Sequence, residues 1–359
     1  MKIALLVHKL TDGGAERVAV LWANGFQKRG NEVQIIIFDD EKPRTYGLSD
    51  SINTVSIVSY KKNRLQRVLD RIIKLRRTLK ESHPDVAIEV MPGWQRLISM
   101  IGLDVIKIST EHQPFEHPEN ADRKVNKVSK FWLNRLYDYV TVLTQADKDV
   151  IGNRLKRVTI LPNPLAIEPV QYVPLKEKII LGVGRKDAWL YKGFDNLIKA
   201  WAQVAHDVSG WKLQIVGSST KGGQGYLETI CQDYGVTDSV EFPDYQSDIQ
   251  PYYQRASIFV LSSRYEGFGL VLIEAMSQGC ACVACDYKGR QSEIVTNGVD
   301  GVTCEPDNVD ALASAIKALI ADDEFRTELQ VNAIRRASDF SVEHIMDRWE
   351  QIFEKCGLK

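Results

Sequence analysis

The chain has 359 residues, and its charges nearly balance, with 46 Lys and Arg against 47 Asp and Glu. This length exceeds what one hydrophobic core usually supports and suits two domains of ordinary size. The composition is that of a soluble globular protein. The sequence contains no run of 18 apolar residues, so no membrane-spanning helix is predicted.

Charge is distributed unevenly along the chain. Residues 1–168 contain 27 Lys and Arg against 20 Asp and Glu, whereas the remainder contains 19 against 27. The basic first half could therefore face an anionic partner.

Strand and helix patterns alternate through the first half, which is typical of parallel βαβ units. A turn at Thr11–Gly14 separates the first strand from the first helix. The expected strands are Lys2–Val7, Val33–Phe38, Ile52–Val58, Val86–Val90, Ile106–Thr110 and Val140–Leu143, and the expected helices are Ala15–Arg29 and Leu65–Leu79.

The alternation pauses at a proline-rich linker, residues 161–174, and then restarts. The later strands are Ile179–Gly184, Lys212–Val216, Val240–Phe242, Ile258–Leu261 and Cys282–Ala284, and the helices are Phe194–Val204, Tyr226–Tyr234, Val309–Ile320 and Val342–Cys356. We therefore predict an α/β protein with two Rossmann-like, doubly wound domains, residues 1–168 and 169–341, facing each other across a cleft. Ligands in such sheets bind outside the carboxyl ends of the strands.

The six cysteines follow no signal peptide, which indicates a reducing cytoplasm. Cys280, Cys282 and Cys285 lie close enough in sequence to suggest a metal site. No second Cys/His cluster with zinc spacing accompanies them, and they alternate as in a buried strand. We predict small buried side chains here and keep the metal site as the weaker alternative.

The segment Arg264–Glu274 carries the strongest functional signal. Its serines and glycines mark a loop that opens a helix near Leu270, where unpaired backbone N–H groups favour an anion. Glu266 lies on the loop and Glu274 about one turn into the helix. The two carboxylates could therefore hold a ligand with sugar hydroxyls at both ends and phosphate between them, such as a nucleotide sugar.

A second candidate is the loop that follows the first strand of the second half. Gly182 and Gly184 are followed by Arg185 and Lys192, whose guanidinium and ammonium groups suit a diphosphate. The alternative is that both charges are merely solvated.

In the first half, Gly13-Gly14-Ala15-Glu16-Arg17 separates the first strand from the first helix. Glycines here would let the backbone approach a ligand, although a plain tight turn is the alternative. The spacing is not that of the dinucleotide fingerprint, which argues against an NAD-dependent dehydrogenase.

Other candidates also follow strands. Glu111 and His112 end a strand, where a histidine would face the cleft, although an isolated histidine is more often structural. Asn163 lies at the hinge and could line the cleft or simply form a turn. Gly289–Glu293, which precedes a predicted helical stretch at Ile294–Thr296, is a further candidate edge of the cleft.

The most basic segment, residues 61–80, also has an apolar face, and residues 123–137 combine basic with aromatic residues. Basic amphipathic helices can lie on anionic membranes, and the alternative is a surface helix packed on the sheet. No motif supports nucleic-acid binding.

Together these motifs resemble glycosyltransferase family 4, the retaining sugar-nucleotide transferases with the GT-B fold. The matching residues cover nearly the whole chain in the family's order, and they are Gly13–Arg17, Glu111, His112, Asn163, Gly184, Arg185, Lys192, Gly193, Glu266–Leu270 and Glu274. The first half looks closest to bacterial enzymes that build lipid-linked oligosaccharides or surface polysaccharides. The resemblance also implies that the C-terminal helix, 342–359, completes the first domain.

The resemblance implies roles for these residues. Arg185 and Lys192 would neutralise the leaving diphosphate, Glu274 would hold the ribose, and His112 would hydrogen-bond the hexose. The hexose and phosphate would be held by Glu266 together with Gly267, Phe268, Gly269 and Leu270. Gly14 and Gly184 would also lie at the donor. The acceptor side would include Gly13, Glu111 and Asn163.

The expected reaction is retaining transfer of a hexose or N-acetylhexosamine, with UDP as the expected nucleotide, to a glycan or polyprenyl-linked acceptor. The positive charge that the leaving diphosphate needs would come from side chains and a helix start, so we expect no metal and no cofactor. The expected location is the cytoplasm, with peripheral attachment to the inner face of the plasma membrane through residues 61–80 and 123–137. A nucleotide-sugar epimerase and a catalytically silent nucleotide-sugar-binding partner are the alternatives.

One feature departs from the family pattern. Arg185 and Lys192 lie seven positions apart, whereas family members usually have a shorter gap. Residues Lys186–Tyr191 therefore contain an apparent insertion, which affects where Lys192 lies.

Overall fold

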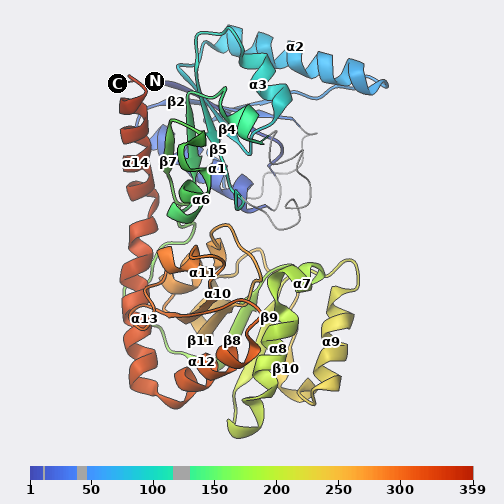
Figure 1. Ribbon diagram of the computed structural model, residues 1–359, viewed down its shortest axis with the longest axis vertical. Helices are drawn as coiled ribbons and strands as arrows, with labels where there is room; N and C mark the ends of the chain where they lie inside the picture. The colour runs from blue at the N-terminus through green and yellow to red at the C-terminus, as the bar shows by residue number, and fades with distance from the viewer. Residues whose placement is uncertain (11–12, 39–46, 116–129, 359) are drawn as a thin grey trace. The chain divides into compact units, whose positions relative to one another are not determined.

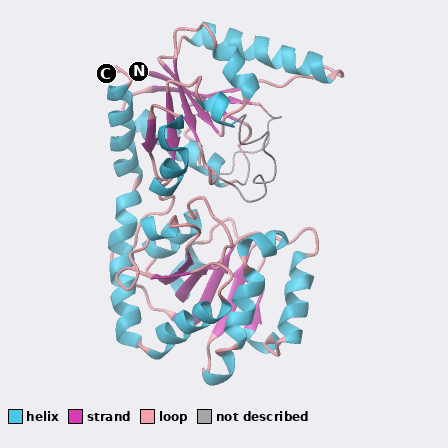
Figure 2. Ribbon diagram, in the orientation of Figure 1, coloured by secondary structure: helices cyan, strands magenta, loops and turns pink. Residues whose placement is uncertain are grey.

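The computed structural model describes residues 1–10, 13–38, 47–115 and 130–358. It contains two compact units: unit 1 is Met1–Ala166 with Ser341–Lys359, and unit 2 is Ile167–Phe340. Each unit consists of a parallel sheet flanked by helices (Figures 1 and 2). The α/β class and the two Rossmann-like sheets predicted from the sequence are confirmed.

The described part of unit 1 has a seven-stranded parallel sheet in the order β3-β2-β1-β4-β5-β6-β7. Its strands are β1 (Lys2–Val7), β2 (Glu32–Ile37), β3 (Asn53–Ser56), β4 (Val86–Val90), β5 (Ile106–Thr110), β6 (Tyr139–Val142) and β7 (Val158–Ile160). Strand order changes direction between β1 and β4, which are neighbours in the sheet. Loops leaving such a switch point diverge and leave room for a ligand.

The sheet of unit 2 has six parallel strands in the order β10-β9-β8-β11-β12-β13. Its strands are β8 (Glu177–Val183), β9 (Lys212–Val216), β10 (Val240–Glu241), β11 (Ala256–Leu261), β12 (Ala281–Cys285) and β13 (Val302–Cys304). Here the switch point lies between β8 and β11.

Helices connect the strands in both units. Those described in unit 1 are α1 (Gly14–Lys28), α2 (Arg64–Ser82), α3 (Trp94–Met100), α6 (Gln145–Ile151) and α14 (Val342–Lys355). Those in unit 2 are α7 (Trp189–Lys192), α8 (Phe194–Ala202), α9 (Gly223–Asp233), α10 (Gln250–Arg255), α11 (Leu270–Ser277), α12 (Val309–Ala321) and α13 (Asp323–Ala337). Across the described ranges, none of the helices combines the length and the apolar character needed to cross a bilayer.

The predicted strands and helices are confirmed to within a few residues, with specific exceptions, whereas residues 11–12 of the predicted turn lie outside the described residues. Ile294–Thr296 is not helical, so that prediction is wrong; the short helical turn is Gln291–Glu293 instead. Helices α3, α6, α7 and α10 and strands β7 and β13 have no counterpart among the predicted elements, and neither has helix α13. Its buried side includes Gln330, whose amide donates to the Ser257 carbonyl, and small alanines, so it shows no clear apolar stripe.

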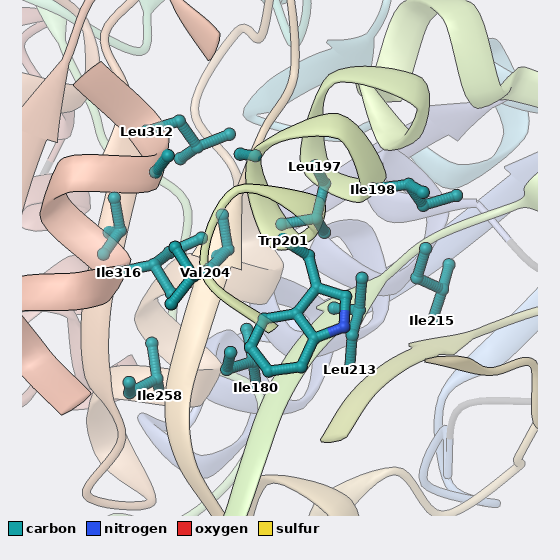
Figure 3. Packing of buried hydrophobic residues seen from close by; sticks show 14 of the residues in the cluster. Ile180, Leu197, Ile198, Trp201, Val204, Leu213, Ile215, Ile258, Leu312 and Ile316 are labelled. Carbon is teal, nitrogen blue, oxygen red and sulfur yellow. The ribbon is translucent and has the colours of Figure 1, made fainter. Parts of the chain in front are cut away.

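The core of unit 2 forms where α8 and α12 cover one face of the sheet (Figure 3). Trp201 of α8 is fully buried, and its indole N–H donates to Ser239 Oγ at 3.0 Å. The indole lies among the sheet residues Ile180, Leu213 and Ile258. This packing holds the strand ends of unit 2 in fixed positions.

The last helix, α14, packs against α1 within unit 1. The Trp349 ring lies edge-on to Trp22 at a centroid distance of 5.1 Å and also contacts Phe26. Arg29, which follows α1, forms ion pairs of 2.6 and 2.7 Å with Asp347 and Glu350. Aromatic packing flanked by ion pairs therefore joins α1, near the start of the chain, to α14, near its end.

The Trp349→Ala variant tests this packing. Removing a fully buried indole leaves a cavity, so we expect the free energy of unfolding to fall by about 3–5 kcal/mol in a urea titration. The exposed neighbour Glu354 provides the control, because Glu354→Ala should change it by less than about 0.5 kcal/mol. Equal effects of the two substitutions would show that α14 contributes little to unit 1.

Candidate functional site

The predicted phosphate-binding residues of unit 2 lie at its switch point. Arg185 lies on the loop that leaves β8, Lys192 ends the short helix α7 in the same connection, and Glu266 lies on the loop that leaves β11. Since β8 and β11 are adjacent parallel strands, both loops start from the same edge of the sheet. This is where open α/β sheets bind ligands.

Glu266 and Lys192 form an ion pair across these two loops. Lys192 Nζ lies 2.9 Å from Glu266 Oε2, and both side chains are largely buried. Tyr191 OH donates to Glu266 Oε1 at 3.2 Å, and Ser263 Oγ donates to Oε2 at 3.2 Å. Tyr191 and Ser263 are not among the site residues predicted from the sequence, because no local sequence pattern links either hydroxyl to Glu266.

A close backbone approach fixes the two loops together. Gly193 has a φ of +64°, and a Cβ there would lie 2.0 Å from the Ser262 carbonyl oxygen. Ser262 Oγ also donates to the Lys192 carbonyl at 2.8 Å. Only glycine fits this approach and this backbone conformation, so the position of Lys192 depends on Gly193.

The apparent insertion before Lys192 is an ordered part of this loop. Residues Lys186–Ala188 form a 3₁₀ turn that leads into α7. The Asp187 carboxylate accepts hydrogen bonds from the backbone N–H groups of Thr220, Lys221 and Gly223 at 2.7–3.0 Å, and these bonds hold the pKa of Asp187 well below its usual range. The loop is thereby attached to the start of α9, while the Arg185 side chain is exposed.

The helix start predicted near Leu270 is confirmed as the first residue of α11. Gly269 precedes it with a φ of +92°. The buried Gln291 donates to the Phe268 carbonyl at 3.4 Å, so the Gly289–Glu293 segment supports this loop from the side. Gly267, Phe268 and Gly269 are themselves buried.

Glu274 lies in α11, as its spacing predicts, and its residue is only 2% exposed. Tyr253 OH donates to Glu274 Oε2 at 3.1 Å. This bond fixes the direction of the carboxylate, and a ligand that reaches Glu274 would meet an oriented acceptor.

In unit 1, the glycine motif lies at the start of α1, directly after β1. Gly13 is the N-cap residue, and the Glu16 carboxylate folds back so closely that a Cβ on Gly13 would lie 1.9 Å from Glu16 Oε2. Gly14 is exposed at the first helical position. The start of α1 thus presents an exposed Gly14 after the carboxyl end of β1, with the Glu16 carboxylate beside Gly13.

His112 follows β5 and is held on both sides. Its Nδ1 lies 3.1 Å from Asn163 Oδ1, its Nε2 lies 3.1 Å from Thr110 Oγ1, and its ring contacts Trp22 at a centroid distance of 5.4 Å. The structure therefore brings together two predicted residues, His112 and Asn163. Burial lowers the pKa of His112 to about 4, although the bond to Asn163 acts in the opposite direction.

Glu111 points into a polar cluster within unit 1. Its carboxylate pairs with Lys130 at 2.8 Å and accepts from Asn134 Nδ2 at 2.9 Å. Because Glu111 is buried, an acceptor would meet its neighbours before it met this carboxylate. Residues 123–129 of the predicted basic stretch lie outside the described residues.

Comparison with known proteins agrees with these features. Residues 12–168 match the family described as Glycosyltransferase Family 4, and residues 166–336 match Glycosyl transferases group 1. A protein of Haemophilus influenzae, named as an uncharacterized glycosyltransferase, is 30% identical over 95% of this chain and 96% of its own. The chain belongs to glycosyltransferase family 4. The predicted family and the predicted class of enzyme are both confirmed.

Two further proteins are similar to this family 4 glycosyltransferase, one in sequence and one in structure. A Campylobacter jejuni protein, 28% identical over 97% of each chain, is named as an α-1,4-N-acetylgalactosaminyltransferase acting on a GalNAc-containing diphospho-undecaprenol glycan. The structure of Anabaena HepE in complex with UDP and glucose, 22% identical, superposes with a TM-score of 0.83 and covers 99% of this chain and 100% of that one. The second similarity shows a shared GT-B fold.

The low pKa of His112 gives a testable titration. The ring should stay neutral at pH 7 and protonate with a midpoint near 4, measured by NMR on labelled protein, with His112→Gln identifying its resonance. Since the pKa in the folded state lies below the ordinary value, His112 stabilises the fold above pH about 6.5, and this contribution is lost as the pH falls toward 4. A midpoint near 6.5 would contradict the buried, neutral ring.

Proposed function

We propose that this glycosyltransferase transfers a hexose or N-acetylhexosamine from a nucleoside diphosphate sugar, with UDP as the expected nucleotide, and retains the anomeric configuration. The observation that carries the proposal is the Lys192–Glu266 pair at the switch point of unit 2, beside the start of α11. A cation, a carboxylate and an anion-favouring helix start together match the diphosphate and hydroxyl groups of such a donor.

The leaving diphosphate requires positive charge. In the proposed complex, Arg185 and Lys192 with the backbone at Phe268–Leu270 supply it, so no metal or other cofactor is needed. The diphosphate would replace Glu266 as the partner of Lys192. The released Glu266 carboxylate could then accept hydrogen bonds from the hexose hydroxyls, while Tyr191 and Ser263 keep it oriented.

The remaining donor contacts come from Glu274, Gly14, Gly184 and His112. Glu274, oriented by Tyr253, would accept from the ribose hydroxyls. Gly14 and Gly184 would allow close backbone approach to the donor.

A hexose hydroxyl that bonds to His112 must replace Thr110 at Nε2 or Asn163 at Nδ1, since both ring nitrogens are occupied. A neutral ring would stabilise the developing sugar cation without adding a like charge. Retention would follow if the acceptor attacks from the face that the diphosphate leaves, with a phosphate oxygen taking the acceptor proton. We assign no general base in the protein.

For the acceptor, we propose a lipid-linked glycan or a growing surface polysaccharide, reached at the inner face of the plasma membrane. The name of the C. jejuni relative, which includes a diphospho-undecaprenol glycan, supports this class. Gly13, Glu111 and Asn163 would lie on the acceptor side, with Glu111 acting through its neighbours because it is buried. The complete set of donor residues argues against a catalytically silent binding partner. The chain's membership in a family of transferases argues against an epimerase.

A thermal-shift screen against nucleoside diphosphates and their sugars, with magnesium or with a chelator, tests the donor class. One nucleotide at 100 times its dissociation constant should add roughly 2.7 kcal/mol of stability. We expect the shift to be the same in magnesium and in the chelator. A shift that requires magnesium would contradict metal independence, and no shift with any nucleotide would contradict the donor proposal.

The ribose role of Glu274 has its own test by calorimetry. Glu274→Ala should weaken binding of the selected nucleoside diphosphate by about ten-fold or more, the loss expected when a hydrogen bond to a charged group disappears. Tyr253→Phe is the matched control, because it removes the partner but keeps the carboxylate, and it should weaken binding less. Unchanged affinity in a folded Glu274→Ala protein would remove the ribose role.

A further inference from the structure

Helix α2 of unit 1 exposes large apolar side chains along one stripe. Leu65, Leu69 and Ile73 are spaced four apart and are 67%, 50% and 64% exposed. Residues four apart lie above one another on one side of a helix, so these three form a continuous row. The same helix buries Leu75 and Leu79 in the unit 1 core, so this row is an additional apolar face and not the face that packs.

Helix α3 adds a second exposed apolar row beside the first. Trp94 and Ile98 of α3, and Ile101 directly after it, are exposed at a spacing of four and three. The two helices lie next to each other (Figure 1). Arg76 of α2 joins them, because its Nη1 donates to the carbonyls of Ser99 and Ile101 at 3.1 and 2.6 Å. Two neighbouring apolar rows make a surface, whereas single exposed apolar residues are ordinary.

The charge at the start of α2 opposes the helix dipole. The first turn contains no acidic residue, and Lys61, Lys62, Arg64 and Arg67 are all exposed. Cations at a helix N-terminus are unfavourable, because the backbone there is already positive. Further along α2, Lys74 pairs with Asp70 at 3.1 Å and Arg77 pairs with Glu81 at 2.8 Å. A local arrangement that costs stability is expected where it serves binding.

We propose that the surface formed by α2 and α3 docks on a bilayer that contains anionic phospholipid. Leucine, isoleucine and tryptophan side chains would enter the boundary between headgroups and acyl chains, and the cations at the start of α2 would contact lipid phosphates. The combination favours a lipid surface, because the four cations beside the apolar rows complement the phosphates of anionic headgroups while the apolar side chains match the acyl boundary.

This inference deepens the proposed function, because a lipid-linked acceptor lies at a membrane surface. The docking itself involves residues outside the donor site. It brings unit 1, which carries Gly13 and His112, to the bilayer, so the enzyme would meet its acceptor by diffusion in two dimensions.

Vesicle co-sedimentation of the full-length protein tests the proposal. Vesicles of phosphatidylglycerol with phosphatidylethanolamine are compared with vesicles of phosphatidylcholine alone, at low and high salt. We expect binding to the anionic vesicles that weakens with salt. The variants Leu69→Gln/Ile73→Gln and Arg64→Gln/Arg67→Gln should each lower the partition coefficient about ten-fold or more.

Matched control variants remove exposed apolar or basic side chains that lie outside α2. Leu175→Gln changes an exposed leucine of unit 2, and Arg348→Gln/Lys355→Gln removes two exposed cations of α14. Both controls should bind vesicles like the wild type. Equal binding by the wild type and the α2 variants, or no binding by the wild type, would overturn the proposal. Concentration-dependent dimerisation that Leu69→Gln/Ile73→Gln abolishes would instead assign the surface to a second copy of the chain.

The nucleotide thermal shift, measured on the same variants, separates this proposal from the proposed function. It should be unchanged in every α2 variant. Loss of vesicle binding in the wild type with an intact nucleotide shift would reject only the docking surface. Vesicle binding without any nucleotide shift would reject only the donor proposal.

Discussion

The 2.9 Å ion pair between Lys192 and Glu266 links the two loops that leave the switch point of unit 2. Both side chains are largely withdrawn from water, so each charge depends on the other. Removing one partner of such a pair leaves the second uncompensated, which costs far more than the pair itself contributes. In the proposed exchange, the diphosphate would take the place of Glu266 beside a lysine that the fold already holds in position.

Several separate features of the fold keep this pair in place. The parallel order of β8 and β11 starts both loops at one edge, and the core around Trp201 fixes the strands beneath them. Gly193 permits the backbone contact with Ser262, and Asp187 attaches the longer loop to α9. The apparent insertion before Lys192 thus has a physical function, because it supplies both the Asp187 anchor and the Tyr191 hydroxyl that bonds to Glu266.

Much of this arrangement could be predicted from the sequence because it depends on local patterns. The alternation of apolar runs predicts both parallel sheets, and the spacing from Gly269 to Glu274 predicts the start of α11 and the place of Glu274 within it. Contacts between distant segments could not be predicted in this way. The pairing of His112 with Asn163, 51 positions apart, and of Tyr191 with Glu266, 75 apart, depends on tertiary packing. Helix α13 escaped prediction because its buried side is partly polar and small, with Gln330 bonded to a strand carbonyl.

In the function proposed above, Lys192 exchanges Glu266 for the diphosphate of the donor. Calorimetry of the nucleoside diphosphate selected by the thermal-shift screen, compared with its unphosphorylated nucleoside, measures the diphosphate contribution directly. Lys192→Gln should reduce the preference for the diphosphate by about ten-fold or more, as expected for a lost charge-assisted bond, while nucleoside binding stays unchanged. Lys178→Gln, an exposed lysine on β8, should leave the preference as it is. If a folded Lys192→Gln protein prefers the diphosphate as strongly as the wild type does, Lys192 does not exchange Glu266 for the diphosphate.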